Sequence, residues 1–297
     1  MTILDLLISS PMFFIALIVM FTLLIGSFLN VVIHRLPIML DREWRQQSQE
    51  LLATISLVPA DKPLPEKYNI VAPRSACPSC GKQITALQNI PVLSWILLKG
   101  KCANCKTSIS IRYPIIETCT ALLSVVVAIK FGVTAQTAAV LVLTWALIAL
   151  SVIDFDHQLL PDQITMPLLW LGLLLTVVKA LPVSTEEAII GAIAGYLSLW
   201  SVYHLFKLVT GKEGMGYGDF KLLAALGAWM GWKMLPVIIL FSAFTGAIVG
   251  IALIVLRGRD RNIPIPFGPY LAAAGWIAML WGNDITGAYL QMVHVTP

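Results

Sequence analysis

Long apolar runs separated by short polar connections dominate the pattern along this chain. A helix needs roughly 17–25 predominantly apolar residues to cross a bilayer. Runs of about that size cover residues 12–33, 114–131, 136–153, 163–181, 188–208, 220–240, 237–256 and 268–282. The sixth and seventh overlap, and we expect Pro236 to mark the turn between them, which leaves the sixth short. The pattern predicts an all-α polytopic membrane protein with about eight transmembrane helices, with seven as the alternative count.

The composition agrees with this fold class. Apolar residues make up 58% of the chain and charged residues only 12%, whereas about 25% of the residues of a soluble domain are charged. Asp5 and no basic residue precede the first apolar run, which also lacks a clean small-residue cleavage site. We expect a retained helix with its N-terminus outside, not a removed signal peptide.

Basic residues are distributed unevenly between the two sides of such a bundle. If the segment after the first helix is cytoplasmic, only Lys130, Lys179 and Lys233 among 20 Lys and Arg fall on the other side. Positive charges concentrate in cytoplasmic loops, so this orientation is the predicted one. The net charge of +4 is then mainly an orientation signal. No basic stripe interleaved with aromatic residues is present, and we expect no nucleic-acid partner.

Three parts of the chain follow from this topology. Residues 1–35 hold the first transmembrane helix, residues 36–113 form a cytoplasmic loop domain, and residues 114–297 form the transmembrane helical core. The first half of the loop domain has the pattern of an amphipathic helix on the membrane surface. A looser proline-containing section is expected from Val58 to Pro73.

Four cysteines in the loop domain form two Cys-x-x-Cys pairs, Cys77 with Cys80 and Cys102 with Cys105. Such pairs supply the four thiolates of a tetrahedral zinc site. Two disulfides are the alternative, but disulfides rarely persist in the reducing compartment that the charge distribution predicts. Four protein ligands leave no open position, so the expected zinc is structural. Cys119 lies in the second apolar run and is expected to serve packing.

Two aspartates stand where apolar segments meet polar connections. Asp154 ends the third apolar run, and Asp219 follows a glycine-rich turn at residues 214–218. Glycine lets the backbone turn sharply and approach another segment closely. The third helix ends, and the sixth begins, on the cytoplasmic side. We therefore expect the two carboxyl groups to lie at the same depth and to be neighbours.

Two close carboxyl groups in a poorly solvated site share a proton, so one can activate water while the other donates to a peptide carbonyl. The chain shows no nucleophile paired with a base and no His-Glu-x-x-His zinc site. The pattern therefore predicts an aspartyl protease. Asp156 and Asp162 share the loop of Asp154 and are alternatives to it, although they are expected to be better solvated. Asp162 is also a candidate N-terminal cap of the next helix.

Other polar features each allow two interpretations. Asn30 and Ser27, inside the first span, serve helix packing or face a substrate. Glu117 is a functional acid, or it lies at the membrane interface or pairs with a residue such as Arg112. The proline-rich segment at residues 264–269 is either a rigid turn or an extended strip beside the catalytic site.

These motifs together resemble the prepilin peptidase family, also called type IV leader peptidases, within the Gly-x-Gly-Asp aspartyl proteases. The resemblance covers essentially the whole chain. Besides the cysteine pairs, it rests on GSFLNVVIHRLP at 26–37, IDFDHQLLPD at 153–162, GKEGMGYGDFKLLAALGAWMG at 211–231 and PIPFGPYLA at 264–272.

The resemblance implies a multi-pass enzyme of the bacterial inner membrane with its active site facing the cytoplasm and its helices in contact with lipid. It implies cleavage of the basic leader of type IV prepilins and type II secretion pseudopilins, then N-methylation of the new N-terminal residue by S-adenosylmethionine. Asp154 and Asp219 would be catalytic, and the four paired cysteines would bind zinc. Methyl transfer rests on the resemblance alone, because the chain has no Gly-x-Gly-x-x-Gly cofactor turn. Residues that would bind the methyl donor are not assigned.

Two other classes of function fit parts of the pattern. An ion or metal transporter would use the intramembrane acids and a zinc-binding cytoplasmic loop, although no internal repeat is evident. A structural scaffold would use the cysteine pairs alone. For a protease, Asp156, Asp162 and Glu213 either attract the basic leader or are simply solvated.

Overall fold

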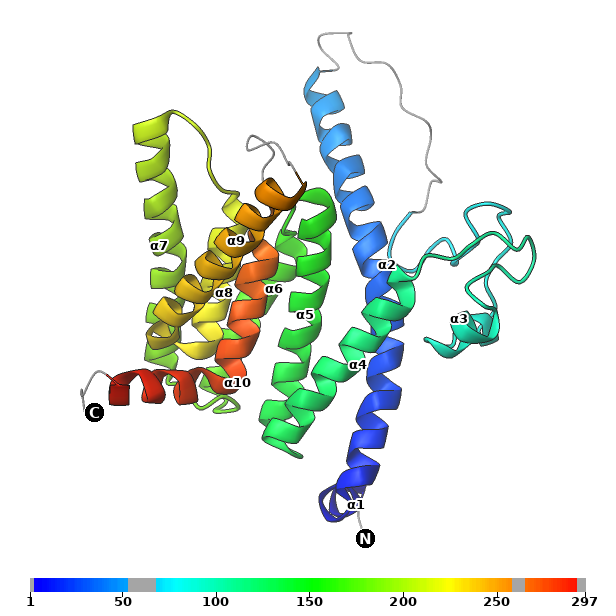
Figure 1. Ribbon diagram of the computed structural model, residues 1–297, viewed down its shortest axis with the longest axis horizontal. Helices are drawn as coiled ribbons and strands as arrows, with labels where there is room; N and C mark the ends of the chain where they lie inside the picture. Colours follow the sequence, from blue (N-terminus) through cyan, green and yellow to red (C-terminus); the bar gives the residue numbers. More distant parts are fainter. Residues whose placement is uncertain (1–2, 53–67, 258–264, 293–297) are drawn as a thin grey trace. The chain divides into compact units, whose positions relative to one another are not determined.

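The computed structural model describes residues 3–52, 68–257 and 265–292, and within them the regular structure is helical, with only isolated β-bridges (Figure 1). The elements are α1 (Ile3–Ser9), α2 (Pro11–Leu52), η1 (Leu87–Asn89), α3 (Leu93–Leu97), α4 (Arg112–Phe131), α5 (Ala135–His157), α6 (Asp162–Val177), α7 (Thr185–Thr210), α8 (Tyr217–Met230), η2 (Trp232–Met234), α9 (Leu235–Arg257) and α10 (Gly268–Met292). The chain divides into two compact units, Met1–Val126 and Val127–Pro297.

Within the described residues, five helices are long and apolar enough to cross a membrane. These are Pro11–Gln49 within α2, Arg112–Phe131, Ala135–His157, Thr185–Thr210 and Trp232–Leu256. Helix α6 is apolar but shorter. The prediction of an all-α protein with membrane-spanning helices is confirmed in this form, and the count of about eight stays a prediction.

Helix α2 does not end with the first apolar run. It continues through Pro37 as one helix of 42 residues, so the predicted amphipathic segment is its extension. Proline removes one backbone hydrogen bond and usually bends or ends a helix. Burial of Leu36 and Leu40 on either side of Pro37 offsets that loss. Much of the looser section predicted from Val58 to Pro73 lies outside the described residues.

The turn between α8 and α9 lies earlier than the sequence suggested. The prediction that Pro236 marks this turn is wrong, because α8 ends at Met230 and Pro236 lies in the first turn of α9. Gly231 makes the turn with φ 76° and ψ 169°, a conformation that L side chains rarely adopt. Proline is well tolerated in a first helical turn, where its missing N–H costs nothing.

In the first unit, the buried Arg35 side chain holds the chain that leads to the cysteines. Its guanidinium donates hydrogen bonds to the carbonyl oxygens of Asn69 and Pro73 at 2.9 and 2.6 Å. The same group lies over the ring of Tyr68, 5.8 Å from its centroid. A buried guanidinium needs such acceptors to replace water. This anchor between α2 and the loop was not predicted from the sequence.

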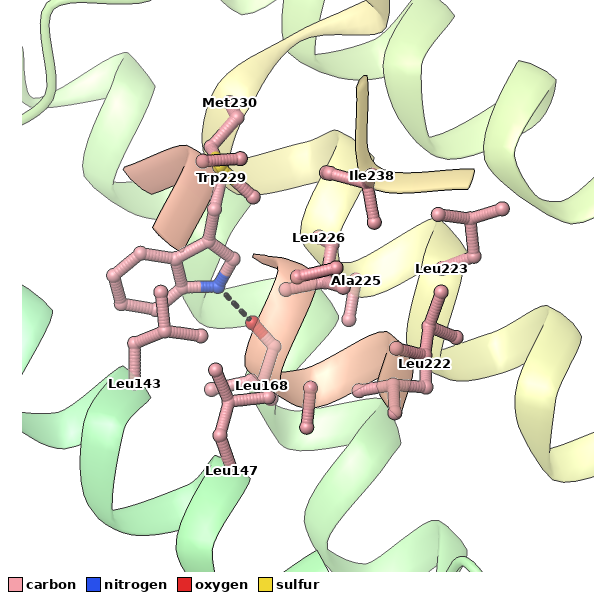
Figure 2. Packing of buried hydrophobic residues seen from close by; sticks show 14 of the residues in the cluster. Leu143, Leu147, Leu168, Leu222, Leu223, Ala225, Leu226, Trp229, Met230 and Ile238 are labelled. Atoms are coloured by element: carbon pink, nitrogen blue, oxygen red, sulfur yellow. Dashed lines mark hydrogen bonds between the residues drawn. The ribbon is translucent and has the colours of Figure 1, made fainter. Parts of the chain in front are cut away.

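The second unit is built around α8, whose residues from Asp219 onward are almost all buried. Gly191 of α7 and Gly227 of α8 bring the two backbones into contact, since a Cβ on either would collide with the other's carbonyl. On another side, the Trp229 indole donates to the Leu168 carbonyl oxygen of α6 at 2.8 Å and packs near Leu143 (Figure 2). Helix α8 therefore holds a fixed position among its neighbours.

Candidate active site and metal centre

Asp154 lies in the last turn of α5, where it is 6% exposed. Gln158 ends the helix in the left-handed conformation, and its N–H donates to the Asp154 carbonyl oxygen at 2.8 Å. At the other end, Thr134 caps α5 by accepting from the Thr137 N–H. Both ends of the helix are thus defined locally, which places Asp154 at the end of a rigid element.

Asp219 lies in the first turn of α8, after the glycine-rich turn, and is also 6% exposed. Its N–H donates to the Gly216 carbonyl oxygen at 3.3 Å. Among the buried side-chain oxygens and nitrogens of the described residues, Asp219 Oδ1 alone lacks a hydrogen-bond partner. Burial, and then the charge of Asp154, raises the pKa of the Asp219 carboxyl to about 7.

Leu160, a buried residue of the loop after α5, lies against the two segments that flank the aspartates. A Cβ on Gly218 would lie 2.7 Å from Leu160 Cβ, and one on Gly268 would lie 3.0 Å from Leu160 Cδ2. The Gly268 N–H donates to Asp154 Oδ2 at 2.9 Å. Gly218, which precedes Asp219, and Gly268, which is hydrogen-bonded to Asp154, therefore both lie against one leucine side chain.

The other acids of this region have different surroundings. Asp162 accepts two hydrogen bonds from Lys221 Nζ at 2.7 and 2.8 Å and is exposed. It begins α6 within the first turn, so the prediction that it is the N-cap is wrong; Pro161 holds that position without a side-chain cap. Glu213 pairs with Lys207 at 2.7 Å, and Asp156 is exposed. Asp162 and Glu213 each form an ion pair with a lysine, and attraction of a basic leader by these acids stays a prediction.

The four cysteines predicted to bind zinc lie together, with their sulfur atoms all within 4.8 Å of one another. Each pair sits on a tight turn of the same design. Cys77 N–H donates to the Lys82 carbonyl and Cys102 N–H to the Thr107 carbonyl, with Gly81 and Lys106 at positive φ. Two such turns facing each other are typical of a four-cysteine zinc site.

The chemistry of this donor set suits a metal cation. Hydrogen bonding, first to the Thr107 hydroxyl and then to its backbone N–H, lowers the pKa of Cys105 to about 6. Metal ions bind the thiolate form, which this shift favours for Cys105. Four sulfur ligands would complete a tetrahedral shell, so a metal held here would have a structural role.

The polar residues of the first unit serve contacts between segments. Glu117 is buried and accepts from the Val92 N–H at 2.8 Å, and its carboxylate also hydrogen-bonds the Ser27 side chain. Asn30 donates to the Tyr113 carbonyl oxygen at 3.3 Å. A Cβ on Gly26 would lie 2.7 Å from Glu117 Cα, so α2 and α4 approach closely there. These contacts match the packing interpretation of Asn30 and Ser27.

One contact of this site was only hinted at by the sequence. The proline-rich segment at residues 264–269 was interpreted as a turn or as a strip beside the catalytic site, without a residue that touches an aspartate. In the structure, the N–H of Gly268 in this segment donates a hydrogen bond to the Asp154 carboxylate. The available signal was a glycine between Phe267 and Pro269, at the start of an apolar run.

Comparison with known proteins adds an independent finding. A model of the bacterial peptidase A24 N-terminal domain matches residues 20–131, and a model of the type IV leader peptidase family matches residues 141–251. No solved structure matches the chain.

Curated relatives cover nearly the whole chain. The prepilin leader peptidase/N-methyltransferase of Aeromonas salmonicida is 57% identical over 283 residues, 95% of this chain and 96% of the relative. That of Pseudomonas aeruginosa is 55% identical over 291 residues, 98% of each, and that of Legionella pneumophila is 44% identical over 285 residues, 96% and 97%. On these matches, the chain belongs to the family of prepilin leader peptidase/N-methyltransferases.

Proposed function

We propose that this chain is a bifunctional membrane enzyme, an aspartic endopeptidase that cleaves the leader of type IV prepilins and type II secretion pseudopilins and then N-methylates the new N-terminal residue. The relatives carry both activities in their names. One observation carries the peptidase part: two buried aspartates at the ends of two helices, one with an oxygen that has no partner among the described residues. The comparisons give no support to the transporter alternative.

In the proposed reaction the aspartates have different roles. Asp154, whose Oδ2 accepts from a backbone N–H, takes a proton from the attacking water. Asp219, protonated up to about neutral pH, donates a hydrogen bond to the scissile carbonyl oxygen. The water oxygen bonds to the carbonyl carbon, the C–N bond breaks, and the proton held by the dyad passes to the leaving amine. No covalent intermediate is needed.

Replacing each aspartate by asparagine tests the dyad. Asp154→Asn and Asp219→Asn keep the shape of the side chain but cannot exchange the proton, so we expect leader release from a prepilin to be abolished in both. Methylation of a pre-cleaved pilin should survive. Asp156→Asn, an exposed neighbour two positions along, is the matched control and should cleave normally. If either dyad variant still cleaves, that residue is not catalytic, and loss in Asp156→Asn would make Asp156 the partner instead.

For the methyl-transfer part, we propose that Cys77, Cys80, Cys102 and Cys105 hold one structural zinc ion that keeps the loop domain folded. The support is the close approach of their four sulfurs. S-adenosylmethionine, when bound, supplies an activated methyl group for the N-terminal amine. Its inclusion rests on the name of the relatives.

We further propose about eight membrane crossings in the bacterial inner membrane, with the dyad and the cysteines on the cytoplasmic side. The support is that each of the eight apolar runs begins on a helix of its own in the described part of the chain. Substrate and lipid are the expected partners, and nucleic acid is not. A prepilin with a membrane-embedded apolar helix and a cytoplasmic basic leader would present its cleavage site at this boundary.

A further inference from the structure

The start of α10 is unusual in how its first N–H group is satisfied. The first N–H groups of a helix lack partners within it and are commonly satisfied by a Ser, Thr, Asp or Asn at the cap. Here the preceding residue is Phe267, whose side chain cannot accept. Its carbonyl oxygen accepts from the N–H groups of Tyr270 and Leu271, and Pro269 has no N–H. That leaves the N–H of Gly268, which donates to Asp154 of α5 at 2.9 Å.

The same position leaves no room for a side chain. A Cβ on Gly268 would lie 2.6 Å from Asp154 Oδ2 and 3.1 Å from its Cγ. Contacts under about 3 Å essentially never occur for a real Cβ, so the carboxylate would have to move. Gly268 has no positive φ that would require glycine for backbone reasons. The absence of a side chain here is therefore explained by the carboxylate and by Leu160, its other close neighbour.

We propose that Gly268 is a positioning residue for Asp154: its N–H orients the carboxylate, and its missing side chain lets α10 close onto it. This inference rests on the proposed peptidase function of the dyad. Because α10 also packs against α5, both the donor and the acceptor are carried by helices that contact each other. Gly268 would not touch the substrate; it would act through Asp154.

The central variant is Gly268→Ala. We expect kcat for leader cleavage to fall about 100-fold, as a displacement of about 1 Å at a reacting group can cause, with KM unchanged. Methylation of a pre-cleaved pilin should be retained. Gly275→Ala is the matched control on the same helix: its Cβ would lie 2.6 Å from Cδ1 of Leu226, a buried leucine and not an aspartate. It should keep kcat even if the thermal midpoint falls.

A double variant separates positioning from simple crowding. Leu160→Val removes the Leu160 Cδ2 atom, which would lie 3.0 Å from the Cβ that Gly268→Ala adds. The close approach of this Cβ to Asp154 remains. If Gly268→Ala acts through Asp154, the double variant stays as inactive as the single one. Recovery of cleavage in the double variant, or normal kcat in Gly268→Ala alone, would overturn the proposal.

A second measurement needs no change at position 268 and covers the case in which Gly268→Ala does not fold. Labelling with ¹³C-carbonyl phenylalanine and ¹⁵N-glycine selects the amides of Phe-Gly pairs, which in this sequence are only Gly132 and Gly268. Asp154→Asn should shift the Gly268 amide resonance and leave that of Gly132 in place. An unmoved Gly268 resonance would refute the contact itself. Failure of the unaltered protein to cleave prepilin would instead refute the proposed function.

Discussion

At the scale of single residues, the two aspartates have unlike surroundings although both are 6% exposed. Asp154 accepts a backbone N–H from Gly268, whereas Asp219 has a buried oxygen without a partner among the described residues. A hydrogen bond to a carboxylate favours its charged form, and desolvation favours the neutral form. In the proposed mechanism, this difference assigns the base role to Asp154 and the acid role to Asp219.

The pH dependence of cleavage follows from the acid role of Asp219. Its pKa is raised to about 7 by burial and then by the charge of Asp154, so the required protonated form is present below that pH and lost above it. We expect kcat/KM for leader cleavage to fall about tenfold per unit as pH rises above the raised value. Cleavage that stays constant up to alkaline pH, measured on purified enzyme in detergent, would contradict this role.

Asp154 also contributes to stability by accepting from the buried Gly268 N–H. Asp154→Ala and Asp154→Asn both remove the charge, but only asparagine keeps an oxygen acceptor. We expect Asp154→Ala to be less stable than Asp154→Asn by about 1–3 kcal/mol, the cost of leaving a buried donor unpaired. Thermal midpoints of the two purified variants measure the difference, and equal midpoints would count against the hydrogen bond.

At the scale of elements, the loop that carries the cysteines has little regular structure to hold it. In its described part only η1 and the five-residue α3 are helical, and each cysteine turn is closed by an isolated β-bridge, Ala76 with Gln83 and Lys101 with Ser108. Neither of these helices has a buried residue, so little apolar burial offsets the conformational entropy of the segment. A metal that joins both turns would supply the missing free energy.

Removing one thiolate from each turn tests this dependence. We expect Cys77→Ser and Cys102→Ser to lose bound zinc, measured by elemental analysis, and to lose methylation far more than leader cleavage, because the dyad lies in the other compact unit. Cys119→Ser is the control, since Cys119 is outside the cluster. Equal loss of both activities with the loop still folded would contradict the assignment.

At the scale of the whole molecule, the charge distribution predicts which connections face the cytoplasm. The connection between α7 and α8 carries Lys212 and follows Lys207, whereas the connection between α6 and α7 carries only Lys179. Positive charge on the first of these favours its cytoplasmic placement, and with it that of Asp219.

Reporter fusions test the orientation. Alkaline phosphatase, which is active only outside the cytoplasm, should be active when fused after Val183 and inactive when fused after Lys212. The opposite pair of results would place the dyad on the outer side and would remove the basis for reaching a cytoplasmic leader. Activity at both positions would mean that α7 does not cross the membrane.

The sequence by itself determined the features that depend on local pattern. Apolar runs predicted the helical membrane fold, because a bilayer requires continuous apolar helices. Cysteine spacing predicted the cluster, because tight turns place both sulfurs of a pair on one side. The dyad was proposed because both aspartates end or begin apolar segments on the same side. The predicted turn at Pro236 failed because proline is tolerated in the first turn of a helix and was given too much weight as a break.

Only the tertiary structure decided which distant residues meet. The N–H of Gly268 donates a hydrogen bond to Asp154, 114 positions away in the sequence. Leu160 lies between two glycines from different helices. Arg35 donates hydrogen bonds to backbone carbonyl oxygens in the segment before the cysteines. The sequence does not show which residues meet in these contacts, because a backbone N–H or carbonyl looks the same at every position in a sequence. Their selection depends on how the helices pack, which periodicity and composition do not encode.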